Sequence, residues 1–316
     1  MSKPQSATDA LDATLRKAIL AGARSSHVRS VVGKYGMQLG ASRFVAGETL
    51  DECVPVLRRI NARGLHANTT LLGEDVTGVE QALAVVEQYR RILDRLHAEE
   101  LRCNVALKLT HLGLETGEDV AYENLRHIVE HAARLGNFIR IDMEYSAVVD
   151  ATLRIYRRLR EAGLDNVGTV LQAYLYRTPN DLEELLPLQP NLRIVKGAYL
   201  EPATIAHPKK PDADAAYVSL VERSLLGEGY TAIAPHDDRL IEHAIAFADR
   251  NAVTRDRFEF QMLYGVRPQL QLGLVARGFK VLVATPFGPQ WFPFLMRRLA
   301  ERPANVGFFV RNLVRR

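Results

Sequence analysis

The feature that most constrains the fold is an alternation of two kinds of segment from about residue 66 onward. Short runs rich in β-branched residues are separated by longer segments whose apolar residues recur at helical spacing. The expected strands are residues 68–72, 104–109, 138–143, 168–174, 192–196, 231–234, 258–262 and 280–283. The expected helices between them are residues 79–99, 121–135, 148–162, 213–226 and 239–248. Strands that alternate with helices indicate βαβ units, and eight strands over about 250 residues predict an α/β protein with a (β/α)8 barrel, the TIM barrel.

The main alternative is an open, doubly wound sheet. That fold would require a G-x-G-x-x-G fingerprint after an early strand, and the chain contains neither this motif nor a Walker loop. The first 65 residues differ from the rest, because they predict only helices, at 11–21, 27–39 and 50–63, the last followed by Gly64 in the C-cap position. We therefore expect a helical appendage, residues 1–65, that packs on a barrel of residues 66–316.

Charge and composition narrow the possible partners and location. The net charge of +4 is modest, and the arginine pairs are dispersed along the chain instead of forming one basic face, which argues against a nucleic-acid partner. The chain has no run of about 18 apolar residues, and we expect no secretory signal because its first 30 residues lack an apolar core. Cys53 and Cys103 are too few for a disulfide framework. We expect a cytoplasmic protein, and nothing in the sequence indicates an oligomeric state.

Polar residues close nearly every expected strand, although barrel strands are normally apolar along their length. These residues are Glu74, Lys108, Asp142, Gln172, Lys196, His236 and Gln261. A single one could simply meet solvent at the end of a strand. The whole series lies at the carboxyl ends of the strands, where barrel enzymes carry their active sites, and it therefore predicts such a site.

The same residues could serve three different chemistries. Lys108 or Lys196 could form a Schiff base, as in barrel aldolases and lyases. Asp142, Glu144 and His236 could bind a metal, but no H-x-H pair accompanies them, and we predict no metal site. Alternatively, the lysines could supply fixed positive charge for a large anionic cofactor whose heterocycle is hydrogen-bonded by Gln172. A barrel that binds ligands without catalysis is a further possibility.

The segment from Trp291 to Arg302 predicts one more helix with an unusual polar end. Arg297 and Glu301 are four residues apart and share a helical face. Arg297 and Arg298 point about 100° apart, so that together they could hold one ligand from two sides. Paired guanidinium groups suit a carboxylate.

Seven segments of the chain resemble monofunctional bacterial proline dehydrogenases. They occur in family order between about residues 40 and 310: LLGE (71–74), LKLT (107–110), IDME (141–144), QAYL (172–175), RIVKGAY (193–199), FQMLYG (260–265) and RRLAERPAN (297–305). The resemblance implies a distorted (β/α)8 barrel that binds FAD without a dinucleotide fold. It also implies oxidation of L-proline to Δ1-pyrroline-5-carboxylate by hydride transfer to flavin N5. The electrons would pass to a membrane quinone, with transient contact between the protein and the inner face of the membrane.

The resemblance also implies roles for individual residues. The substrate-binding residues would be Lys108, Asp142, Tyr199, Leu263, Ala284, Phe294, Arg297 and Arg298, of which Lys108, Asp142, Arg297 and Arg298 would be catalytic. Glu74 would pair with Arg297 as a gate. The flavin contacts would be Gln172, Arg193, Val195, Lys196, Gly197, Ala198, His236 and Glu301.

The substrate side of this pattern is altered. The family usually reads Tyr-x-Pro-Tyr-Gly after the last strand, where this chain has Ala284-Thr285-Pro286-Phe287-Gly288, and Phe294 replaces a tyrosine that faces the substrate. Pro235-His236 replaces a Thr-His pair. The loss of two phenols leaves proline and a ring-substituted proline, such as hydroxyproline, as alternative substrates.

Overall fold

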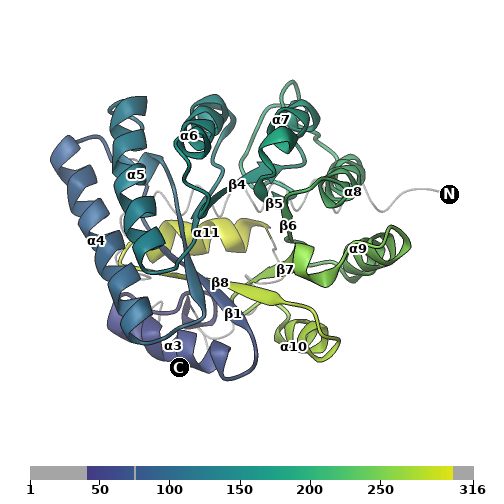
Figure 1. Cartoon of the computed structure of the whole chain (residues 1–316), viewed down its shortest axis with the longest axis horizontal. Coiled ribbons are helices and arrows are strands. Elements are labelled where there is room, and N and C mark those ends of the chain that lie inside the picture. Colours follow the sequence, from purple (N-terminus) through teal and green to yellow (C-terminus); the bar gives the residue numbers. More distant parts are fainter. Residues whose placement is uncertain (1–40, 75, 302–316) are drawn as a thin grey trace.

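Eight parallel strands form a closed barrel in the computed structural model, which describes residues 41–74 and 76–301 (Figure 1). The strands are β1 (His66–Leu71), β2 (Cys103–Leu107), β3 (Ile139–Ile141), β4 (Val167–Gln172), β5 (Asn191–Val195), β6 (Tyr230–Ile233), β7 (Phe258–Leu263) and β8 (Val281–Phe287). Each strand pairs with the next, and β8 pairs with β1 to close the barrel. The predicted (β/α)8 barrel is confirmed.

Helices connect the strands and surround the barrel. They are α4 (Val79–Ala98), α5 (Glu118–Arg134), α6 (Val149–Glu161), α7 (Thr178–Leu185), α8 (Lys210–Leu226), α9 (Asp238–Arg250) and α10 (Pro268–Ala276). Every helix expected between strands is present, with ends that differ by a few residues. The short helices α7 and α10 had not been predicted.

The ring of helices is distorted at the point where the barrel closes. Helix α11 (Trp291–Glu301) lies across the barrel in Figure 1 instead of joining the ring beside β8. Its place is filled by α3 (Leu50–Asn61), which packs against β1 and β8 with Cys53 and Leu57 fully buried. Thr49 caps α3 by accepting a hydrogen bond from the Glu52 backbone. The N-terminal segment thus supplies a structural helix of the ring.

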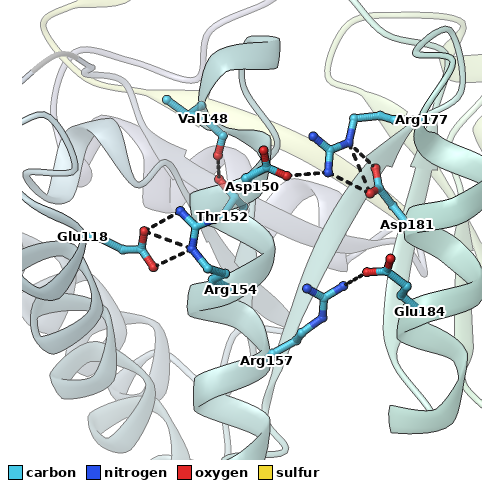
Figure 2. A network of polar contacts seen from close by, with 9 residues as sticks. All are labelled: Glu118, Val148, Asp150, Thr152, Arg154, Arg157, Arg177, Asp181 and Glu184. Carbon is cyan, nitrogen blue, oxygen red and sulfur yellow. Dashed lines mark hydrogen bonds and ion pairs between the residues drawn. The ribbon is translucent and has the colours of Figure 1, made fainter.

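The outer helices are joined by ion pairs on the solvent side, shown in Figure 2. Arg154 of α6 contacts Glu118 of α5 at 2.7 Å, and Arg157 contacts Glu184 of α7 at 2.6 Å. Exposed pairs of this kind contribute about 0–1 kcal/mol each. This network joins neighbouring helices on the outside of the molecule.

Part of the predicted N-terminal segment lies outside residues 41–301. The helices expected at residues 11–21 and 27–39 lie outside the described residues, and the division into an appendage and a barrel stays a prediction. Within residues 41–74 and 76–301, no helix combines the length and the apolar character needed to cross a membrane.

Candidate active site

A cavity of about 710 Å³ opens at the carboxyl ends of the strands. Thirteen of the sequence-predicted site residues line it: Lys108, Asp142, Gln172, Arg193, Val195, Lys196, Gly197, Ala198, Tyr199, His236, Leu263, Ala284 and Phe294. These residues come from most of the strands and the loops that follow them, and from α11, so the barrel brings together positions that are far apart in the sequence. Their individual roles stay predictions.

Arg193 is the most firmly held charged group in this cavity. It projects from β5 and is 9% exposed. Its Nη1 donates to Asp142 Oδ1 at 2.6 Å, and its Nη2 donates to Asn68 Oδ1 at 2.8 Å. Its Nε donates to Gln261 Oε1. A guanidinium has five N–H bonds, and two of those of Arg193 have no hydrogen-bond partner among the residues that the structure describes.

Lys108 lies at the end of β2 and forms an ion pair with Glu74, which follows β1. Both side chains are largely buried, and this raises the strength of the pair above that of an exposed one. The predicted gate pairs Glu74 with Arg297, but the side chains of Arg297, Arg298 and Glu301 lie outside the described residues. The backbone of α11 carries all three positions.

Lys196 is held by a second carboxylate. It follows β5 and pairs with Asp214 of α8 at 2.5 Å, and Asp214 also pairs with Lys210 one helical turn earlier. These contacts and burial act in opposite directions on Asp214, and its pKa is lowered overall. A Schiff-base lysine must react as a neutral amine, whereas a neighbouring carboxylate stabilises the ammonium form. The pairs formed by Lys108 and Lys196 therefore favour fixed positive charge over Schiff-base chemistry.

The residues considered for a metal site turn toward different protein partners. Asp142 is engaged by Arg193, and buried Glu144 accepts hydrogen bonds from Thr110, from Oγ1 at 2.6 Å and from the backbone N–H at 3.2 Å. His236 Nε2 accepts from the Leu263 backbone at 3.0 Å, which leaves Nδ1 to carry the ring proton. Asp142 Oδ1, both carboxylate oxygens of Glu144 and His236 Nε2 thus each accept from a donor of the protein. No group of three potential metal ligands occurs among the described residues.

Gln172 occupies the last position of β4 and is buried. Its Nε2 donates to the Glu144 carbonyl at 2.7 Å, and Thr178 Oγ1 donates to its backbone carbonyl at 2.6 Å. The bond from Nε2 fixes the orientation of the side-chain amide, whose Oε1 can accept a hydrogen bond, and Gln172 lines the cavity.

The loop after β5 is folded tightly over Tyr174. Gly197 has φ +115°, and a Cβ there would lie 2.1 Å from the Tyr174 ring, so only glycine fits. Tyr174 OH donates to the Tyr199 carbonyl at 3.2 Å. Farther along the loop, Glu201 accepts from the Ser146 backbone and hydroxyl, both at 2.7 Å. These contacts place Tyr199 at the cavity.

An apolar wall faces these charged groups. Leu263 and Ala284 are paired in register on β7 and β8, and Phe294 of α11 also lines the cavity. Trp291 and Leu295 are buried with Phe44 and Leu72 and so attach α11 to the mouth of the barrel. Ala284 contributes only a methyl group to this wall.

Sequence reasoning missed several residues that build this site. Asn68, Asp214 and Glu259 were not considered, although Asn68 and Glu259 are polar residues within strands that are otherwise buried. Side chains two apart on a strand point to the same side. This spacing relates Glu259 to Gln261 and could have identified Glu259 from the sequence.

Comparison with known proteins identifies the family. The model of the family "Proline dehydrogenase" matches residues 53–311. The chain is 39% identical over 282 residues to proline dehydrogenase 1 of Bacillus subtilis, covering 89% of this chain and 93% of that protein. It is 39% identical over 309 residues to proline dehydrogenase of Deinococcus radiodurans, covering 96% and 99%.

Solved structures support the same architecture. Proline utilization A (PutA) from Bdellovibrio bacteriovorus superposes with a TM-score of 0.78 at 24% identity. The match covers 85% of this chain and 33% of that much longer one. The fold, the family model and the identity over most of the chain agree, and the chain belongs to the proline dehydrogenase family, a family of flavin-dependent enzymes that oxidise proline.

Proposed function

We propose that this chain uses FAD to oxidise L-proline to Δ1-pyrroline-5-carboxylate, or a ring-substituted proline to the correspondingly substituted pyrroline carboxylate, and passes the electrons to a quinone. The observation that carries the proposal is Arg193, a buried guanidinium at the cavity wall that three side chains hold in place, two of whose N–H bonds have no partner among the described residues. A cation in this position stabilises the negative charge that a flavin acquires on reduction.

The donor set around the cavity fits FAD. The volume of about 710 Å³ lies in the range of cofactor sites, about 300–1,000 Å³. Gln172 and Arg193 offer an acceptor and donors for the heterocycle. Lys196, with His236 nearby, offers positive charge for the diphosphate. Val195, Gly197, Ala198 and Glu301 are the remaining proposed contacts.

The substrate is proposed to lie between the charged and apolar walls. Lys108, together with Arg297 and Arg298, would bind the carboxylate, while Tyr199, Leu263 and Phe294 would pack against the ring. Asp142 would act mainly through Arg193, and Glu74 would form the gate with Arg297. Charged groups held in a closed site stabilise an anion without reorganisation and so fix the substrate orientation. The bound flavin would supply the hydride acceptor.

The small side chain of Ala284 in this wall bears on the choice of substrate. A tyrosine in this position would fill space beside the ring, whereas Ala284 leaves that space to a ring substituent. We therefore propose that a hydroxylated proline is penalised less here than in relatives that carry both tyrosines. A neighbouring side chain such as Phe287 or Phe292 would have to enter the gap for this expectation to fail.

The quinone acceptor and the transient contact with the membrane surface are proposed from the family resemblance, and a cytoplasmic location is proposed with them. No nucleic-acid partner is expected from the dispersed basic residues.

The cofactor proposal is tested on the purified protein. The expected result is a bound flavin spectrum and one FAD released per chain on denaturation. If no flavin is released and added FAD gives no bound spectrum, the proposed function is wrong. Borohydride trapping of a carbonyl substrate on Lys108 or Lys196 would instead support a Schiff-base lyase or aldolase.

A further inference from the structure

A buried carboxylate, Glu259, contacts one of the side chains that hold Arg193, and the proposed function gives it no role. Glu259 is 3% exposed and lies on β7, two residues before Gln261, so that both side chains point to the same side of the strand. The cavity lining includes Gln261 and Arg193 but not Glu259. Glu259 is therefore one step removed from any ligand in the cavity.

We propose that Glu259 is a positioning residue that orients the Gln261 amide and thereby holds Arg193 in place for FAD. This inference rests on the proposed function. Gln261 Nε2 donates to Glu259 Oε1 at 2.5 Å, and Gln261 Oε1 accepts from Arg193 Nε. A carboxylate can only accept hydrogen bonds. Glu259 therefore binds the NH2 group of Gln261, and the carbonyl oxygen of Gln261 is left to face the Arg193 guanidinium.

The opposite side of Arg193 is arranged by the same principle. Asn68 Nδ2 donates to Asn104 Oδ1 at 2.5 Å, which directs Asn68 Oδ1 to Arg193 Nη2. Both amides thus present acceptors to the guanidinium because a second residue takes their donors. On the Gln261 side, that second residue is charged.

Glu259 is kept ionised by its surroundings. Its Oε2 pairs with Lys280 at 2.8 Å and accepts from Tyr230 OH at 3.0 Å. Burial alone would raise the pKa of Glu259, but Lys280, the Gln261 hydrogen bond and Arg140 outweigh it and lower the pKa overall. Two donors therefore approach Oε2 from the far end of the barrel, and one donor approaches Oε1 from the cavity side.

Glu259→Gln makes this arrangement inconsistent. Lys280 and Tyr230 both donate toward the position of Oε2, so the new amide turns its carbonyl to them and its NH2 group to Gln261. Gln261 must then turn its carbonyl to the residue at 259 and its NH2 group to Arg193. The NH2 group of Gln261 and the N–H of Arg193 Nε are both donors and cannot form a hydrogen bond. The guanidinium loses one of its three supports.

Adding Lys280→Met to this variant removes the conflict. Without Lys280, Tyr230 OH can accept from the NH2 group of the residue at 259, whose carbonyl can again face Gln261. The double variant also removes a charge pair as a unit, so its net charge equals that of the wild type. Lys280→Met alone keeps the carboxylate and with it the orientation of Gln261, which makes it the matched control.

The test measures the FAD dissociation constant and the reduction potential of bound FAD at pH 8. Glu259→Gln is expected to raise the dissociation constant about tenfold and to lower the potential, because Arg193 stabilises the reduced flavin less well. The double variant is expected to recover most of both values, and Lys280→Met to remain within about twofold of the wild-type constant. A purely through-space effect predicts the opposite sign, since loss of a negative charge raises the potential.

The results of this test distinguish failure of the inference from failure of the proposed function. If the wild type binds no FAD, the proposed function and the inference both fail. If the wild type binds FAD and Glu259→Gln leaves both quantities unchanged, raises the potential, or is not rescued by Lys280→Met, the inference alone is overturned.

A second set of variants tests the inference if Glu259→Gln does not fold. Gln261→Met removes the amide at similar length, and it should weaken FAD binding by itself. The double variant Glu259→Gln/Lys280→Met, which keeps a carbonyl facing Gln261, should instead stay within about twofold of the wild-type dissociation constant. If Gln261→Met leaves FAD binding unchanged, or if the double variant weakens it as much as Gln261→Met does, the inference is overturned.

Discussion

Protonation of His111 should destabilise the protein in mild acid. The ring follows β2, beside Lys108, and is 5% exposed. Its Nδ1 has no hydrogen-bond partner among the described residues, and a Cβ on Gly73 would lie 2.3 Å from its Nε2. Burial, followed by the charge of Lys108, lowers the pKa of His111 from 6.5 to about 4. The folded protein therefore excludes a proton that the unfolded chain accepts.

The sign and size of the effect follow from linkage. Between pH 6.5 and 4 the unfolded state binds more protons at this position, so the free energy of unfolding falls as the pH falls. Above pH 6.5 both states are neutral and the effect is absent. From pH 7 to pH 4.5, a pKa difference of this size corresponds to a loss of about 2–3 kcal/mol.

Urea unfolding at pH 7 and pH 4.5 measures this loss directly. His111→Leu should lose about 2–3 kcal/mol less than the wild type over this interval, whatever its stability at pH 7. His127→Leu, at an exposed position of α5, is the matched control and should behave as the wild type does. If His111→Leu and the wild type lose the same free energy, His111 is not the buried neutral group that this reasoning requires.

Three further predictions concern the cavity. Arg297→Ala and Arg298→Ala should each lower kcat/KM for proline by about 30-fold or more at unchanged FAD content. The reason is that loss of one partner of a buried charge pair costs about 2–5 kcal/mol. Unchanged kinetics in both variants would place the arginine pair outside the site. Ala284→Tyr should shift the kcat/KM ratio for proline over trans-4-hydroxyproline about tenfold toward proline, and a flat ratio would contradict the assigned position. Lys196→Met should raise the FAD dissociation constant about tenfold, whereas Lys209→Met should not, and equal effects would deny Lys196 a specific role.

Most of the barrel could be predicted because its strands carry a strong local signal. The carboxyl end of β8 differs most from the prediction, since the strand was expected to stop at residue 283 and extends to Phe287. Pro286 lies inside that strand, and proline lacks the N–H that a central strand normally donates. Its carbonyl still accepts from Ala46 at 2.8 Å, and it pairs in register with Thr70.

Helices α7 and α10 were missed for local reasons. In α10, Leu270, Leu272 and Leu274 alternate with other residues in a pattern typical of a strand, and Gly273 weakens the helical signal. Helix α7 has only eight residues and begins at Thr178-Pro179, which indicates a turn as readily as a helix. That α3 takes the place of α11 in the ring of helices could not be predicted from the sequence, because it depends on how distant segments pack.

The candidate site was predicted in outline, since polar residues at strand ends must converge in a parallel barrel. Its orienting groups were not, because Asp214 lies on a helix and reaches Lys196 only in the folded chain. Asn68 and Glu259 lie within strands, where a polar residue is uncommon, and their partners become visible only once the barrel closes.

Anaerobic reduction of the bound cofactor tests the central claim most directly. FAD-loaded protein is mixed with L-proline without oxygen, while the absorbance of oxidised flavin and the appearance of Δ1-pyrroline-5-carboxylate are followed together. The account predicts that the flavin is bleached and that one product molecule forms per FAD reduced. If the flavin stays oxidised with L-proline and with trans-4-hydroxyproline, the cavity is not the proline-oxidising site described above.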